Sequence, residues 1–172
     1  METRYNENYD TALRRLLVTD CTASALQETS VGTSQILSTI PEKPDLFTLR
    51  RGEVLLFHGT PRSNVSEIIQ HGFKTEKNRR SAYGRGTYLT DSSQKADQYT
   101  DILGRRTKGL TMFLVRVALG WMVKEQFSHL DCDTVIAGKG NLFQEFVAKK
   151  DENLFPLFLI EYDRVHENDN LV

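Results

Sequence analysis

A nearly continuous apolar run at residues 110–119 sets the strongest constraint on the fold of this chain. Arg116 is its one charged residue, and the run is far too short to cross a membrane as a helix. Apolar runs of this length that lack helical spacing are typical of strands buried on both faces. The sequence therefore predicts a sheet with a buried strand at this point of the chain.

Further strands are predicted by short apolar runs bounded by turn-forming residues. These runs cover residues 54–57, 86–89, 143–148 and 154–162. The first of them ends just before His58 and Gly59, which we place at the exit of that strand. Because short helical patterns lie between the strands, the sequence predicts a strand-rich α+β domain with short helices.

Two short helices are expected between the strands. Asn64 and Glu67 match a capping box at the start of the first, and Gly72 is a helix stop at its end. The second follows Asp91, a residue type that favours helix starts. Both helices would follow predicted strands.

The chain length of 172 residues fits one domain of ordinary size. Asp10 is expected to cap a short N-terminal helix, and a Ser/Thr-rich segment follows it. We therefore predict that residues 1–45 form a helix and a partly disordered appendage, and that residues 46–172 form the compact domain.

Charge and cysteine content exclude several classes of protein. The 22 basic and 23 acidic residues give a net charge of -1, so no overall field draws the chain to nucleic acid or to anionic lipid. Cys21 and Cys132 stand far apart and form no CxxC pair, which argues against a zinc site or a disulfide framework. The N-terminus lacks the features of a secretory signal. These observations favour the cytoplasm or the nucleus.

Glu145 raises the first chemical question. Strand alternation places it on one face with Phe143 and Val147, where a carboxylate is costly unless it is paired or functional. One carboxylate beside aromatic rings suits cleavage of a glycosidic bond, whose transition state is oxocarbenium-like. Ordinary glycosidases need a second carboxyl group to protonate the leaving group. The nicotinamide ring of NAD is already cationic and becomes neutral when its bond to the sugar breaks. It therefore needs no proton from a general acid, and a single carboxylate suffices.

Three separated blocks of sequence resemble one known family. HGT at residues 58–60, YGRGTYLTDSSQKADQY at 83–99 and QEFVAKKDENLFPLFLIEY at 144–162 are similar to the catalytic domain of poly(ADP-ribose) polymerases and related diphtheria-toxin-like ADP-ribosyltransferases. Their order and spacing agree over about residues 53–162. The resemblance implies two packed, mostly antiparallel sheets with short flanking helices. It also implies an enzyme that uses NAD, needs no metal, and transfers ADP-ribose to a protein acceptor with release of nicotinamide.

The resemblance implies roles for the first block. His58 would hydrogen-bond the adenosine-side ribose and so position NAD for the reaction. Gly59 would offer its backbone N–H and C=O to the nicotinamide carboxamide, and Thr60 would add a hydroxyl nearby. A histidine after a buried strand is by itself more often a structural residue, and only the matching blocks favour a site.

The other two blocks supply the remaining residues that the resemblance implies. Tyr88 and Tyr99 would sandwich the nicotinamide ring, and Glu145 would steady the oxocarbenium charge, so that His58, Tyr88 and Glu145 form the catalytic set. Lys95 also matches the family. Ala96 departs from it, because many relatives carry there a serine whose hydroxyl binds the carboxamide. The loss of one such hydrogen bond predicts weaker NAD binding.

Several functions stay open at this point. Glu145 is compatible with polymer formation in the family, and we favour transfer of a single ADP-ribose unit. A module that binds NAD or ADP-ribose without turnover is the alternative that Ala96 suggests, and poly(ADP-ribose) formation is another. Transfer to nucleic acid gets little support from the balanced charge. Each aromatic residue could also be core packing, and Glu145 could be a solvated strand residue.

Overall fold

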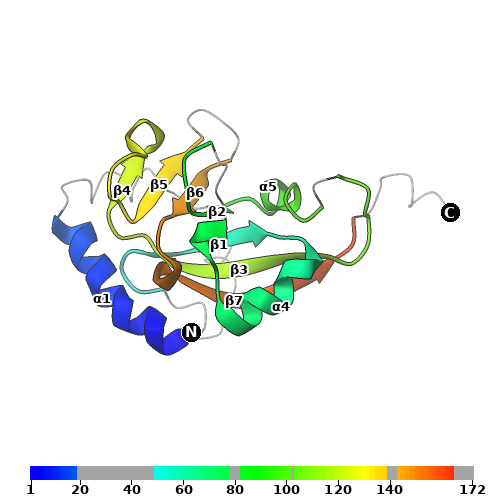
Figure 1. The fold of residues 1–172 in the computed structure, drawn as a ribbon, viewed down its shortest axis with the longest axis horizontal. Coiled ribbons are helices and arrows are strands. Elements are labelled where there is room, and N and C mark those ends of the chain that lie inside the picture. Colours follow the sequence, from blue (N-terminus) through cyan, green and yellow to red (C-terminus); the bar gives the residue numbers. More distant parts are fainter. Residues whose placement is uncertain (19–48, 78–81, 102, 139–142, 165–172) are drawn as a thin grey trace, which may run out of the picture.

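A computed structural model of the chain describes residues 1–18, 49–77, 82–101, 103–138 and 143–164. The strands are β1 Glu53–Gly59, β2 Thr87–Thr90, β3 Leu110–Ala118, β4 Met122–Lys124, β5 Thr134–Ala137, β6 Glu145–Ala148 and β7 Leu154–Tyr162. The helices are α1 Glu2–Val18, α4 Val65–His71 and α5 Ser93–Asp97, with 3-10 turns η2 Arg62–Asn64, η3 Thr75–Lys77, η4 Glu125–Phe127 and η5 Asp151–Asn153. Figure 1 shows α4 beside β3 and β7, and α1 along one end of the sheet.

The seven strands form one sheet in the order β4-β5-β6-β2-β1-β3-β7. Every neighbouring pair is antiparallel except β4 and β5, so the predicted α+β class and mostly antiparallel pairing are confirmed. We expected two packed sheets, whereas the hydrogen bonding runs through one. β1 and β2 pair at Phe57 and Thr90 alone. This narrow junction joins β4-β5-β6-β2 to β1-β3-β7, so the two predicted sheets are two parts of a continuous one.

The core lies on β3, as its apolar run predicts. Phe113, Val115 and Val117 are buried there, and they pack in one cluster with Ile68 of α4 and Phe73. β3 is buried along almost its whole length because it lies between β1 and β7. The same cluster extends across the junction to β2 and β6, so packing ties the two parts of the sheet together where hydrogen bonds are few.

Helix α1 belongs to the compact part of the molecule. Tyr5, Tyr9 and Ala12 follow helical spacing, are buried, and face β3 and β7. The prediction that Asp10 caps the start of a short helix is wrong, since α1 begins at Glu2. The Ser/Thr-rich segment that we predicted to follow this helix lies outside the described residues.

A buried carboxylate at the start of β1 anchors α1. The Tyr5 hydroxyl donates to Glu53 Oε1 at 2.8 Å, and Arg50 Nη2 donates to the same oxygen at 2.7 Å. The Arg50 guanidinium also lies 3.6 Å from the centre of the Tyr9 ring. Because Glu53 is only 6% exposed, these donors compensate a charge that water cannot reach.

Replacing Tyr5 with Phe is expected to lower the free energy of unfolding by about 1.5–3 kcal/mol, the usual contribution of a hydrogen bond to a charged group. The change removes one donor to Glu53 and keeps the ring. Urea unfolding followed by circular dichroism measures the loss. Tyr9→Phe is the control, because the Tyr9 hydroxyl donates to a neutral acceptor, the Arg51 carbonyl, and should cost about 0.5–1.5 kcal/mol. A Tyr5→Phe loss no larger than the control would contradict this account.

Helix α4 is confirmed, but its predicted capping box is absent. Residues Arg62–Asn64 form a 3-10 turn before the helix, which places Asn64 in a helical conformation with φ -91° and ψ -12°. Its side chain therefore caps nothing, and Nδ2 donates instead to the Thr60 hydroxyl at 3.2 Å. Gly72 ends the helix as predicted, in the left-handed region at φ +76°.

Candidate active site

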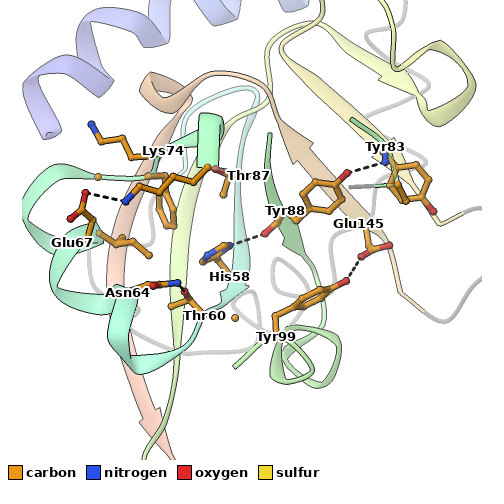
Figure 2. Close-up of a pocket in the computed structure, with 16 residues that line it drawn as sticks. His58, Thr60, Asn64, Glu67, Lys74, Tyr83, Thr87, Tyr88, Tyr99 and Glu145 are labelled. Carbon is orange, nitrogen blue, oxygen red and sulfur yellow. Dashed lines mark hydrogen bonds and ion pairs between the residues drawn. The ribbon is translucent and has the colours of Figure 1, made fainter. Parts of the chain in front are cut away.

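A cavity of about 500 Å³ opens where β1, β2, β6, α4 and η3 meet, within the size range of small-molecule sites. Figure 2 shows His58 near its middle, Glu145 and Tyr99 at one end, and Lys74 and Glu67 at the other. The predicted site residues that line it are His58, Gly59, Thr60, Tyr88, Tyr99 and Glu145. Segments far apart in the sequence thus meet around one hollow.

His58 belongs to β1, which continues through Gly59 instead of ending before it as we predicted. Its Nδ1 donates to the Tyr88 carbonyl at 2.8 Å, so the second nitrogen, Nε2, is the acceptor in the neutral ring. Burial lowers the pKa of His58, and the hydrogen bond to Tyr88 offsets part of that effect. The edge of the ring meets Phe73, with centroids 5.0 Å apart. His58 is therefore a fixed, neutral imidazole that lines the cavity.

Gly59 is required by a close backbone contact. A Cβ atom at this position would lie 1.8 Å from the Ala96 carbonyl oxygen and 2.7 Å from its carbon. Helix α5 therefore packs directly against the backbone of β1, and Ala96 is only 1% exposed. Ala96 and Gly59 also line a small adjoining space, together with Tyr88, Tyr99 and Glu145. This contact explains why a glycine follows His58.

Thr60 is held just beyond β1. The Thr111 hydroxyl donates to the Thr60 carbonyl at 3.0 Å, and the Asn64 side chain donates to the Thr60 hydroxyl. Thr60 is 3% exposed, yet it lines the cavity. Its position is therefore set by both β3 and η2.

Glu145 begins β6 and faces the cavity. Tyr99 donates its hydroxyl to Glu145 Oε1 at 3.1 Å, and the Lys95 ammonium lies 3.7 Å from the same oxygen. Lys95 and Tyr99 thus approach the same carboxylate oxygen, Lys95 from α5 and Tyr99 from the turn after that helix ends at Asp97. Burial raises the pKa of Tyr99, and the Glu145 charge adds to that shift. The carboxylate is held by a phenol and a cation.

The strand alternation predicted for Glu145 is confirmed toward Val147 but not toward Phe143, because β6 begins at Glu145, two residues later than predicted. Phe146 points away from the cavity into the main core, whereas Val147 packs in a separate cluster with Tyr83 and Tyr88. Val147 is directly opposite Tyr88 across the β6–β2 pairing. The carboxylate and the Tyr88 ring therefore stand on the same face of the sheet.

The family model described as the poly(ADP-ribose) polymerase (PARP) catalytic domain matches residues 22–168. The chain belongs to this family. No curated protein matches it. Members of the PARP family are NAD-dependent ADP-ribosyltransferases, so the resemblance read from the three sequence blocks is confirmed at the level of the family.

The Tyr88 hydroxyl in this PARP-family chain is held by a turn that sequence reasoning did not single out. The Tyr83 backbone N–H donates to it at 2.9 Å, and it donates to the Gly84 carbonyl at 3.0 Å. The Tyr83 ring lies nearly parallel to that of Tyr88, with centroids 6.4 Å apart. Tyr83 opens the YGRGTY motif, so its place beside a predicted site residue was the available signal.

The end of the cavity far from Glu145 carries charges that were also missed. Lys74 and Lys77 line it, and Lys77 donates to Glu67 of α4 at 3.2 Å. Charged residues in a polar loop are usually solvated, so their sequence pattern gives no sign of a site. Within the described parts of the chain, no group of three His, Cys, Asp or Glu side chains could hold a metal ion. No described helix is long and apolar enough to span a membrane.

Proposed function

We propose that this chain transfers a single ADP-ribose unit from NAD to a protein side chain and releases nicotinamide. The observation that carries the proposal is the common position of Glu145, Tyr88 and Tyr99 at one end of a cavity whose middle holds His58. A flat cationic ring between two phenol rings is favoured by their electron-rich faces. The cavity volume suits an extended dinucleotide that lies partly in solvent.

The residues present fit NAD along the length of the cavity. Gly59 lines the cavity, where its backbone N–H and C=O would meet a carboxamide. The neutral His58 ring offers Nε2 as an acceptor for a hydroxyl of the adenosine-side ribose. Because the diphosphate of NAD joins its two riboses, it would run between His58 and Glu145, and the adenine would extend toward the end that Lys74 and Lys77 line. Binding in this order leaves the nicotinamide ribose beside Glu145.

The reaction needs one bond to break and one to form. The bond between the ribose C1′ and the pyridinium nitrogen breaks, and its electron pair neutralises the departing nicotinamide, so no general acid is needed. The sugar is left oxocarbenium-like, and the Glu145 carboxylate steadies that charge. A lone pair of the acceptor side chain then forms the new bond to C1′, and the acceptor proton passes to solvent. His58 and the rings of Tyr88 and Tyr99 position NAD for the reaction, which lowers the barrier further.

Ala96→Ser is expected to tighten NAD binding by about 0.5–1.5 kcal/mol, which corresponds to a lower Kd by about two- to tenfold. The reason is the carboxamide hydrogen bond that many relatives make at this position and that alanine cannot make. Calorimetry with NAD, in the absence of any acceptor, measures the change. Ser93→Ala in the same helix is the control, because its side chain is exposed and should leave the affinity unchanged. Equal Kd values for Ala96→Ser and the parent chain would contradict the prediction.

Incubation with NAD labelled on its adenylate part tests the proposal. We expect covalent label on an acceptor protein, with one nicotinamide released for each unit transferred. Mass spectrometry distinguishes the alternatives, since a single added ADP-ribose supports the proposal and a ladder of units supports polymer formation. Tight NAD binding with neither label nor free nicotinamide would favour a binding module without turnover.

A further inference from the structure

The turn at residues 83–85, which holds the Tyr88 hydroxyl, is itself fixed by a lysine. Lys149 Nζ donates to the Tyr83 carbonyl at 3.0 Å and to the Arg85 carbonyl at 2.9 Å. Between these two carbonyls lies Gly84, where an added Cβ would stand 3.2 Å from the ammonium. The turn therefore wraps closely around one cation, and each of its three residues contributes a backbone group to Lys149 or to Tyr88.

Lys149 differs from its neighbour Lys150 in what it binds. Lys150 pairs with the buried Asp133 carboxylate at 2.8 Å, which is an ordinary compensation of charge. Lys149 is half-buried and directs its ammonium to neutral carbonyls of the turn. Burial lowers the pKa of Lys149, as expected for a cation taken partly out of water. Partial burial of an ammonium group that binds only neutral carbonyls costs desolvation free energy. Such a cost is expected where the geometry of the turn is needed for function.

We infer that Lys149 is a positioning residue that sets the ring of Tyr88 against the nicotinamide, by holding the turn that clamps the Tyr88 hydroxyl. The inference rests on the proposed function. Strand β6 carries Glu145 at its start and Lys149 directly after its end, and it pairs with β2 throughout. One strand thus fixes both the carboxylate and, through the turn, the ring that faces the same substrate. Figure 2 shows Tyr83, Tyr88 and Glu145 at this end of the cavity.

A double-mutant cycle on nicotinamide binding tests this role. The variants are Lys149→Met, Tyr88→Phe and the two combined, with Kd for nicotinamide measured by calorimetry. Tyr88→Phe keeps the ring and removes the hydroxyl that the turn clamps. We expect Lys149→Met to weaken nicotinamide binding by about tenfold, as loss of charged hydrogen bonds allows. In the Tyr88→Phe background, Lys149→Met should raise the Kd for nicotinamide by less than about twofold. Both substitutions break the same connection, which runs from Lys149 through the turn to the Tyr88 hydroxyl.

Two further variants separate positioning from stability. Lys149→Arg, which retains donors and charge, should restore binding to within about threefold of the parent chain. Lys150→Met is the matched control: it should lower the unfolding temperature, since it uncovers part of Asp133, without changing the Kd for nicotinamide. If Lys149→Met does not fold, Lys149→Gln takes its place in the cycle with the same expectations.

The outcomes are distinct. Nicotinamide binding by the parent chain, with a non-additive cycle and rescue by Lys149→Arg, supports the inference. Additive effects of the Lys149 and Tyr88 substitutions, or a Lys149→Met variant that binds like the parent chain, would overturn the inference and leave the proposed function standing. A parent chain that binds no nicotinamide would overturn the proposed function, and the inference with it.

Discussion

Glu145→Gln is expected to lower kcat for ADP-ribosyl transfer by about tenfold or more, equivalent to a barrier increase of about 1.4 kcal/mol or more. The amide keeps the size of the side chain but removes the negative charge that steadies the oxocarbenium-like sugar. Tyr99 and Lys95 now direct a hydroxyl and an ammonium at one carboxylate oxygen, and both would face a neutral group. Initial rates of nicotinamide release, with and without acceptor, measure the loss.

The loss should fall on the chemical step and not on binding of the departing ring. We therefore expect the Kd for nicotinamide to stay within about threefold of the parent value, because ring stacking does not involve the carboxylate charge. Glu161→Gln is the matched control, since Glu161 is a half-exposed residue of β7 paired with Arg62. An active parent chain whose Glu145→Gln variant turns over at the same rate would show that the carboxylate is not catalytic.

Gly59→Ala is the second change with a large expected effect. The new methyl group would stand 1.8 Å from the Ala96 carbonyl oxygen, so β1 and α5 must move apart. Forced overpacking of this kind costs about 1–3 kcal/mol of stability. The shift also carries Tyr99 and Lys95 away from Glu145, so nicotinamide binding should fall by about tenfold or more. Thermal unfolding and calorimetry measure the two effects separately.

A second glycine provides the control for that experiment. Gly104 has φ +61°, and an added Cβ there meets nothing within 4 Å. Gly104→Ala should therefore cost about 1–2 kcal/mol through backbone strain alone. It should leave nicotinamide binding intact. If Gly59→Ala binds nicotinamide like the parent chain, α5 does not have to lie against β1 for the site to form, and our account of that contact is wrong.

Long apolar runs made the sheet predictable. The bounds of β7 are those expected from the sequence, and β3 differs by one residue at its end. In β3 the apolar run also marks burial, whereas most residues of β7 are only half-buried. β4 and β5 were missed because they are short, at three and four residues, and carry no long apolar run. Their strand conformation depends on pairing with each other and with β6.

The ends of elements were less predictable than their presence. His58 and Gly59 resemble a strand exit, yet both pair with β3, opposite Phe113 and Met112. Asn64 resembles a helix cap, yet a preceding 3-10 turn directs its side chain to Thr60. In each case a tertiary contact overrides a local preference.

In the candidate site too, residues marked by local sequence could be predicted, and residues that depend on tertiary contacts could not. Glu145, Tyr88 and His58 could be predicted, because sequence blocks around them are distinctive, and the structure brings them to one cavity. Lys149 could not be predicted, because its role depends on a turn far away in the sequence that only the β2–β6 pairing brings beside it. Tyr83 lies between these cases, since it belongs to the YGRGTY motif but its backbone makes the contact.

A crystal structure of the protein with nicotinamide bound tests the central claim most directly. We predict the pyridine ring between Tyr88 and Tyr99, its carboxamide hydrogen-bonded to the Gly59 backbone, and its ring nitrogen directed toward the Glu145 carboxylate. A ring bound elsewhere in the cavity, or one seated with its nitrogen turned away from Glu145, would contradict the account.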